Sequence, residues 1–177
     1  MERSDLIQGL REIDPTKPYG TELFDVLARL TVSVAVEAVC LRLDPGTKKV
    51  EVYMIQRSLD DTAYPGEWHC PGSVLRPREE IEDIFSRLQK KEFGSFAHLG
   101  EKRFVANVNH PTEARGHFLS LVYLCNLADD DVGNWDISHL RGKWFPVDQL
   151  PEETIEHHLK RIIPCALGAF VADRSDI

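Results

Sequence analysis

The sequence lacks the features that would place the protein in a membrane or on a nucleic acid. Its longest apolar run, 32–43, is interrupted by polar residues and is too short to span a bilayer. Residues 1–15 lack the apolar core of a signal peptide. The formal net charge is −8, whereas general nucleic-acid binding requires a basic surface. We therefore expect a cytoplasmic protein with no membrane or general nucleic-acid partner, although a small phosphorylated ligand would need only local positive charge.

Cysteine is scarce, and its spacing argues against two common kinds of stabilising site. The chain contains four cysteines, at Cys40, Cys70, Cys125 and Cys165. Because none of them forms a C-x-x-C pair, we expect neither a disulfide framework nor a zinc site. We expect buried thiols, since free cysteine is usually buried. Internal repeats and low-complexity segments are also absent from the sequence.

The composition is typical of a single soluble globular domain. The 177 residues are 42% hydrophobic and 28% charged. Residues 1–32 are expected to form an N-terminal helical extension, with short helices at 4–11 and 21–30 separated by a turn rich in proline and glycine. This extension either covers a sheet edge or mediates a homodimer. Residues 33–177 are expected to form the main domain.

The pattern of the main domain predicts strands, one helix, more strands and a final helix. Strands are expected at 32–43, 49–56, 102–109, 117–127 and 144–147. The final helix is expected to open at Pro151 and to end or kink at Pro164. This order predicts an α+β sandwich with a mixed sheet rather than regular βαβ winding.

The stretch 71–95 is the most informative part of the chain. It consists of a Pro-Gly turn, a loop, a charged helix and a second glycine. The apolar residues of the helix recur at the spacing of one helical face, at Ile81, Ile84, Phe85 and Leu88. Acidic residues occupy its first turns and basic residues its last turns. That distribution matches the helix macrodipole and by itself requires no function.

The same stretch resembles the box of the Nudix hydrolase superfamily, G-x5-E-x7-R-E-U-x-E-E-x-G-U, where U is aliphatic. Counted from Ser73, the matching positions are Glu79, Arg87, Glu92 and Gly94. Other segments are similar to family motifs in the same order, namely Gln56-Arg57, the Y-P-G-x-W sequence 64–68 and the W-x-P-x-D-E-L-P-like sequence 144–151. The resemblance covers about 33–170 and implies a Nudix-type α/β/α sandwich.

The resemblance also implies roles for individual residues. Glu79 and Arg87 would pair to brace the loop against the helix, supported by the glycines Gly72 and Gly94. In the family, glutamates on the second half of the box helix hold divalent cations against a diphosphate. The resemblance therefore implies Mg²⁺ or Mn²⁺ as cofactor if the protein is active, with Glu92 and Glu79 as metal ligands.

Two of the three expected metal-ligand glutamates are replaced in this sequence. Their positions correspond to Leu88, Lys91 and Glu92. Leu88 has no ligand atom, and Lys91 brings a positive charge to the place of the cation. Gln89 also replaces an aliphatic residue, which suggests that Leu88 has taken a core position. Glu92 remains as the expected metal ligand and catalytic residue.

Two functional hypotheses follow. In the first, the protein is a Mg²⁺-dependent pyrophosphohydrolase acting on a nucleoside diphosphate linked to another group, with carboxylates such as Glu79, Glu80 or Glu113 recruited beside Glu92. In the second, favoured here, the domain binds a nucleotide-type ligand or a protein partner with weak or no hydrolysis, and it does so with or without a cofactor. Phosphate would then be bound directly by Lys91, Arg57 and Arg76.

A few other residues have competing interpretations. Trp68 either stacks on a nucleobase or belongs to the core. Glu113, in an expected loop at 110–113, is either solvated or a general base. His157 and His158 are expected at the surface of the last helix, and no role is assigned to His69.

Overall fold

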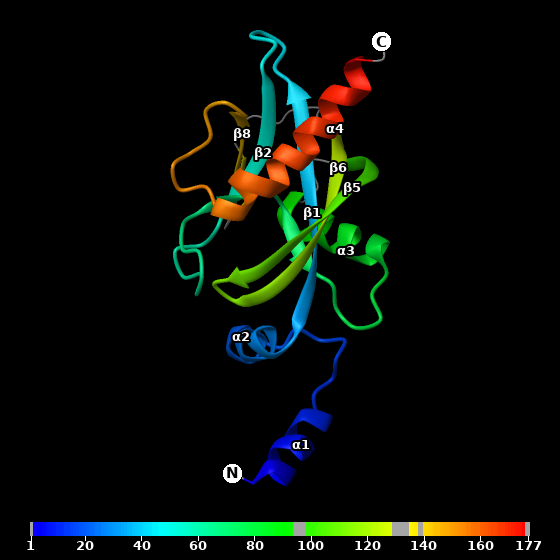
Figure 1. The fold of residues 1–177 in the computed structure, drawn as a ribbon, viewed down its shortest axis with the longest axis vertical. Coiled ribbons are helices and arrows are strands. Elements are labelled where there is room, and N and C mark those ends of the chain that lie inside the picture. Colours follow the sequence, from blue (N-terminus) through cyan, green and yellow to red (C-terminus); the bar gives the residue numbers. More distant parts are fainter. Residues whose placement is uncertain (1, 94–97, 129–134, 138–139, 176–177) are drawn as a thin grey trace.

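A mixed β-sheet lies at the centre of the protein (Figure 1). The computed structural model describes residues 2–93, 98–128, 135–137 and 140–175. The strands are β1 (Val32–Leu43), β2 (Val50–Gln56), β3 (Trp68–His69), β4 (Gly72–Val74), β5 (His98–Glu113), β6 (Gly116–Ala128), β7 (Trp135–Ile137) and β8 (Leu140–Pro146). They follow the order β5-β6-β1-β2-β8-β7, with β3 beside β2 and β4 beside β1. The β1–β6 pair is parallel and the others are antiparallel, which confirms the predicted mixed sheet.

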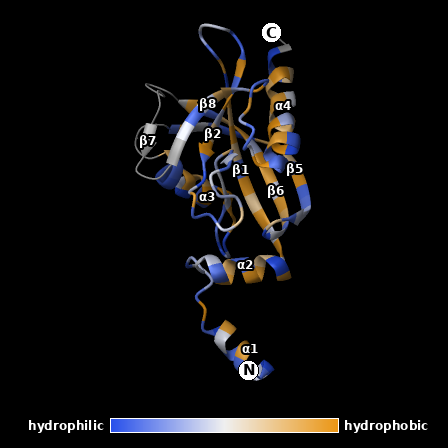
Figure 2. Cartoon of the chain, turned by 90° about the vertical axis from the view of Figure 1, so that its left-hand side faces the viewer, coloured by the Kyte–Doolittle hydropathy of each residue, from blue (hydrophilic) through white to orange (hydrophobic). Residues whose placement is uncertain are grey.

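Helices cover both faces of this sheet. The helical elements are α1 (Arg3–Arg11), α2 (Thr21–Leu30), α3 (Ile81–Leu88), η1 (Gln89–Phe93), η2 (His158–Ile162) and α4 (Ile163–Ser175), of which η1 and η2 are π-helical. Figure 2 shows α3 on one side of β1 and β6 and α4 on the other, with apolar strands between them. The predicted α+β fold, an α/β/α sandwich, is confirmed.

Two apolar clusters fill the layers between the sheet and its helices. Alternate residues of β1 point to opposite faces, so Val36, Ala38 and Cys40 pack beneath α3 while Val39 and Leu41 pack beneath α4. The central part of β1 is therefore buried on both sides, which explains its nearly continuous apolar sequence.

The helix α3 is fixed by its cap and by its apolar face. Glu80 and Asp83 form a reciprocal capping box, in which the backbone N–H of Glu80 donates to Oδ2 of Asp83 at 2.9 Å. Ile84, Phe85 and Leu88 then pack into the core, and Leu88 is 1% exposed. Leu88 is thus a core residue.

The π-helical segment η1 changes which residues face the core after α3. Glu92 and Phe93 are both buried, and Phe93 stacks on Tyr53 with ring centroids 5.7 Å apart. The wider turn of a π-helix allows these adjacent side chains to be buried together. Lys91, between the core-facing positions, is exposed.

Two sequence predictions about element boundaries were wrong. The last helical region begins with η2 rather than at Pro151, and it continues through Pro164 as α4. Proline is tolerated there because it follows directly on a π-helical segment, where the regular i to i−4 hydrogen-bond pattern is already interrupted. Residues 110–113, expected as a loop, belong to β5 because they continue its pairing with β6.

The cysteines agree with the expectation of mostly buried thiols. Cys40, Cys70 and Cys125 are buried free thiols, and Cys165 is a partly buried one. Among the described residues, no helix has the length and apolar character needed to cross a membrane.

We predict that Leu88→Ala lowers the free energy of unfolding by about 2–5 kcal/mol, because it leaves a cavity beneath α3. Urea denaturation measures this change. The matched control is Lys90→Ala at an exposed neighbouring position, which should stay within about 0.5 kcal/mol of the parent protein. Equal effects of the two substitutions would show that Leu88 is not a core residue.

Candidate functional site

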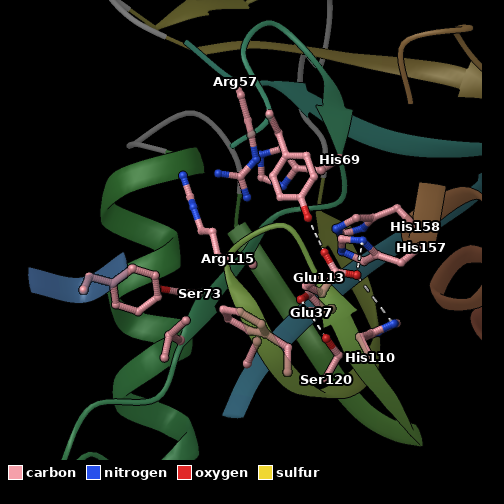
Figure 3. Close-up of a pocket in the computed structure, with 16 residues that line it drawn as sticks. Glu37, Arg57, His69, Ser73, His110, Glu113, Arg115, Ser120, His157 and His158 are labelled. Carbon is pink, nitrogen blue, oxygen red and sulfur yellow. Dashed lines mark hydrogen bonds and ion pairs between the residues drawn. The ribbon is translucent and has the colours of Figure 1, made fainter. Parts of the chain in front are cut away.

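Two adjoining hollows lie where β1, β4 and the β5–β6 hairpin meet α2. One is a cavity of about 90 Å³, shown in Figure 3, and the other is a groove of about 420 Å³. Six residues line both hollows, namely Phe24, Arg57, Gly72, Ser73, Val74 and Arg115. The groove has the volume of a small-molecule site.

The groove is basic, although the chain as a whole is acidic. Its lining contains six basic residues, Lys17, Arg57, Arg76, Arg87, Lys91 and Arg115. Within the described part of the chain, no acidic residue lines the same surface. An anionic ligand would therefore meet an attractive field in a protein whose formal net charge is −8.

One of these basic residues, Arg87, forms an ion pair with Glu79. The Nε and Nη2 atoms of Arg87 donate to the two carboxylate oxygens of Glu79 at 3.0 and 2.8 Å. Arg87 also donates to the hydroxyl of Ser73 and to the carbonyl of Val74, while the backbone N–H of Arg76 donates to Glu79. This two-point pair joins the loop after β4 to α3 and leaves both oxygens of Glu79 engaged.

Two other cations, Arg57 and Arg115, are oriented by Asp61. Nη1 of Arg57 and Nη2 of Arg115 donate to different oxygens of Asp61, at 2.9 and 2.7 Å. Burial acts to raise the pKa of Asp61, but backbone N–H groups of Ala63 and Tyr64 and the two guanidinium groups lower it. Asp61 therefore stays charged at neutral pH. The Nε atoms of both arginines have no hydrogen-bond partner among the described residues.

Two buried carboxylates, Glu37 and Glu92, lie near Gly72. A Cβ atom on Gly72 would collide with Oε2 of Glu37, so the approach of β4 to Glu37 requires glycine. Burial raises the pKa of Glu92 to about 7, although Lys91 and Arg57 act to lower it. Burial also raises the pKa of Glu37 to about 7. Oε2 of Glu92 has no hydrogen-bond partner among the described residues.

The cavity in Figure 3 contains an acid–histidine cluster, made of Tyr64, His110, Glu113 and His157. The hydroxyl of Tyr64 donates to Glu113, and Nδ1 of His157 lies 2.8 Å from the other Glu113 oxygen. Burial acts to raise the pKa of Glu113, but these two contacts lower it. Glu113 is therefore a weaker proton acceptor than an ordinary glutamate, which argues against its role as a general base.

Three histidines of the cavity, His69, His110 and His158, are largely neutral at pH 7. Burial lowers the pKa of His110 to about 4 and also lowers the pKa of His69 and His158. Nδ1 of His69 donates to the carbonyl of Cys70 at 2.7 Å, and Nδ1 of His158 accepts from the Cys70 N–H at 3.3 Å. The expectation of a surface His158 was wrong, since it is 2% exposed.

Three of the expected ligand-binding residues, Arg57, Arg76 and Lys91, are brought together in the groove. Glu92 lies buried and is not part of the lining of either hollow. Trp68 packs in the core against Phe145, with ring centroids 4.8 Å apart, and also does not line the two hollows. Gly94 lies outside the described residues.

Comparison with known proteins agrees with this architecture. The profile of the NUDIX domain family matches residues 34–165, about three quarters of the chain. The chain belongs to the NUDIX domain family. A search of curated proteins finds no significant match.

Several solved structures share the fold. A mutT/nudix family protein from Listeria innocua superposes with a TM-score of 0.62 at 16% identity, covering 82% of this chain and 98% of that one. The NUDIX domain of Shewanella oneidensis NrtR in complex with ADP ribose gives 0.58 at 19% identity, covering 96% and 99%. The C-terminal domain of mouse MUTYH in complex with human PCNA gives 0.60 at 14% identity, covering 78% and 90%. Identities this low establish the fold alone.

The NUDIX family generally uses divalent cations, but the donor set of this NUDIX domain does not fit one. Leu88 is buried in the core, Lys91 is cationic, and both oxygens of Glu79 are engaged by Arg87. Glu92 and Glu37 remain as nearby carboxylates. Among the described residues, no group of three or more histidine, cysteine, aspartate or glutamate side chains is arranged to hold a metal ion.

Several residues of the site were missed by sequence reasoning. Glu37 had one signal, since it is an isolated acid in an apolar strand. Asp61, Arg115 and His110 had none, because their roles depend on the meeting of segments distant in sequence. Phe24 was assigned to an extension and not to a site.

We predict that Glu92→Gln stabilises the protein more at pH 8 than at pH 5. Between the reference pKa of 4.5 and the folded value of about 7, the unfolded chain has lost a proton that the folded protein keeps, so the free energy of unfolding falls as pH rises. Because glutamine does not titrate, the variant keeps this stability at high pH. Its free energy of unfolding at pH 8 should exceed that of the parent protein by about 1–3 kcal/mol. Thermal and urea unfolding at both pH values measure it.

The control for this prediction is Glu82→Gln, at an exposed position of α3. Its effect on stability should be small at both pH values. A Glu92→Gln variant that is no more stabilised at pH 8 than at pH 5 would contradict the raised pKa.

Proposed function

We propose that this NUDIX domain binds a nucleoside diphosphate-type ligand directly through basic side chains, with weak or no hydrolysis. The observation that carries the proposal is the groove of about 420 Å³, lined by six basic residues and, among the described residues, by no acidic one. A diphosphate carries several negative charges and many acceptor oxygens, which arginine and lysine bind by charge-assisted hydrogen bonds.

The change at Lys91 supports direct phosphate binding. Lys91 occupies a position where the family pattern has a glutamate, and its side chain lines the groove. The positive charge of Lys91 then takes the place of the metal cation that the glutamate would have held. Arg57 and Arg115 add guanidinium groups whose orientation is set by Asp61. The three side chains approach the groove from separate segments of the chain.

ADP ribose is the natural first probe for this site. A NUDIX domain with the same fold was solved in complex with it, and it combines a diphosphate with two ribose groups and a base. A neutral or donor-rich part of such a ligand suits the cavity with the acid–histidine cluster, because Glu113 is anionic there and would repel phosphate.

The alternative is a Mg²⁺-dependent pyrophosphohydrolase. One observation favours it: Oε2 of Glu92 is buried without a hydrogen-bond partner among the described residues, and an unpaired buried carboxylate oxygen is unusual unless it has a ligand or a proton. The raised pKa of Glu92 provides the proton in the binding hypothesis. The two hypotheses therefore differ in what occupies this oxygen.

We predict that ADP ribose binds the full chain in the presence of EDTA and that Lys91→Glu weakens this binding at least tenfold, because a carboxylate then faces the phosphates. Isothermal titration calorimetry at pH 7.5 measures the affinity. Lys90→Glu is the matched control, since it makes the same charge change at an exposed neighbour that is not part of the groove lining. Equal losses in both variants would reject specific binding at Lys91.

A hydrolysis screen with nucleotide sugars, dinucleoside polyphosphates and nucleoside triphosphates in Mg²⁺ and Mn²⁺ separates the alternative. Turnover that disappears in Glu92→Gln would establish the hydrolase and reject the proposal. If no nucleotide binds or is hydrolysed, a protein partner becomes the remaining role of the domain.

A further inference from the structure

The N-terminal segment contributes a wall of the groove, although it lies outside the family-matched region 34–165. Lys17 and Tyr19, which precede α2, line the groove, and Phe24 on α2 lines both the groove and the cavity. Figure 1 shows α2 beside the end of the sheet, with α1 further away. The site is therefore built from two parts of the chain.

Close packing holds α2 against the β5–β6 hairpin. Gly116 has a φ of 140°, and a Cβ atom there would collide with the carbonyl oxygen of Ala28, which is 1% exposed. The rings of Phe24 and Phe118 lie 6.5 Å apart. Because glycine at position 116 lets the helix approach this closely, α2 is a docked element of the domain.

Polar contacts connect the same helix to the phosphate-binding arginines. Nε of Arg115 lies 3.7 Å from Oδ1 of Asp25, and the hydroxyl of Thr62 donates to Oδ2 of Asp25 at 3.2 Å. Arg115 also donates to Asp61, which in turn orients Arg57. The position of α2 and the orientation of the two arginines are thus linked through Asp25 and Arg115.

We propose that the N-terminal segment forms the ring-binding wall of the ligand site, with Phe24 and Tyr19 contacting the nucleobase while the arginines hold the diphosphate. This inference rests on the proposed nucleotide binding. Aromatic faces are suited to bases because they stack without requiring a particular pattern of hydrogen bonds. The two aromatic residues lie in the same lining as the basic residues, so one nucleotide contacts both kinds of surface.

The test compares two probes, ADP ribose and inorganic pyrophosphate, by isothermal titration calorimetry on the full chain. Phe24→Ala should weaken binding of ADP ribose about tenfold and leave the affinity for pyrophosphate unchanged, because pyrophosphate has no ring. Phe24→Tyr should retain the affinity for ADP ribose. The matched control is Val26→Ala, on an exposed position of the same helix, which should alter neither affinity.

The outcomes separate this inference from the function on which it rests. Equal losses of affinity for both probes in Phe24→Ala would mean that Phe24 only supports the fold of the groove, which overturns the inference. Unchanged binding of ADP ribose in that variant overturns it as well. A parent protein that binds neither probe would instead reject the proposed function.

Discussion

The site depends on the clamp that Asp61 forms with Arg57 and Arg115. Arg57 and Asp61 lie four residues apart in the loop between β2 and β3, and Arg115 directly precedes β6, so one carboxylate joins two segments that are distant in sequence. Arg115 extends the connection to α2 through Asp25. Because partner charges and backbone N–H groups lower the pKa of Asp61, the clamp remains charged at neutral pH and holds both guanidinium groups at the groove.

Basic, acidic and neutral side chains occupy different parts of the site. Basic side chains line the groove, whereas Glu37 and Glu92, two carboxylates with raised pKa values, lie buried near Gly72. The cavity contains Glu113 together with His110, whose pKa is lowered by burial. The buried carboxylates can be protonated near neutral pH, so they do not cancel the field that attracts an anion. Under the proposed function, this arrangement would attract a phosphate-bearing ligand to an acidic protein through basic side chains.

Sequence reasoning was most successful where a role is local. The apolar spacing of α3, the limits of α2 and the family motifs all depend on nearby residues, and the mixed sheet followed from the order of strands and helices. It was less successful at the π-helical segments, because no simple periodicity reveals where a helix widens. The buried Glu92 lies within η1, and the continuation of α4 through Pro164 follows η2.

The sequence by itself determined the family, the sandwich and the replacement of metal-ligand glutamates by Leu88 and Lys91, since each depends on the identity and spacing of residues close together in the chain. Only the tertiary structure decided that Lys91 shares a groove with arginines from other segments, that Glu37 lies buried beside Gly72, and that α2 belongs to the site. The physical reason is that charge attraction, burial and close packing act between residues brought together by the sheet, and their separation in sequence carries no periodic signal.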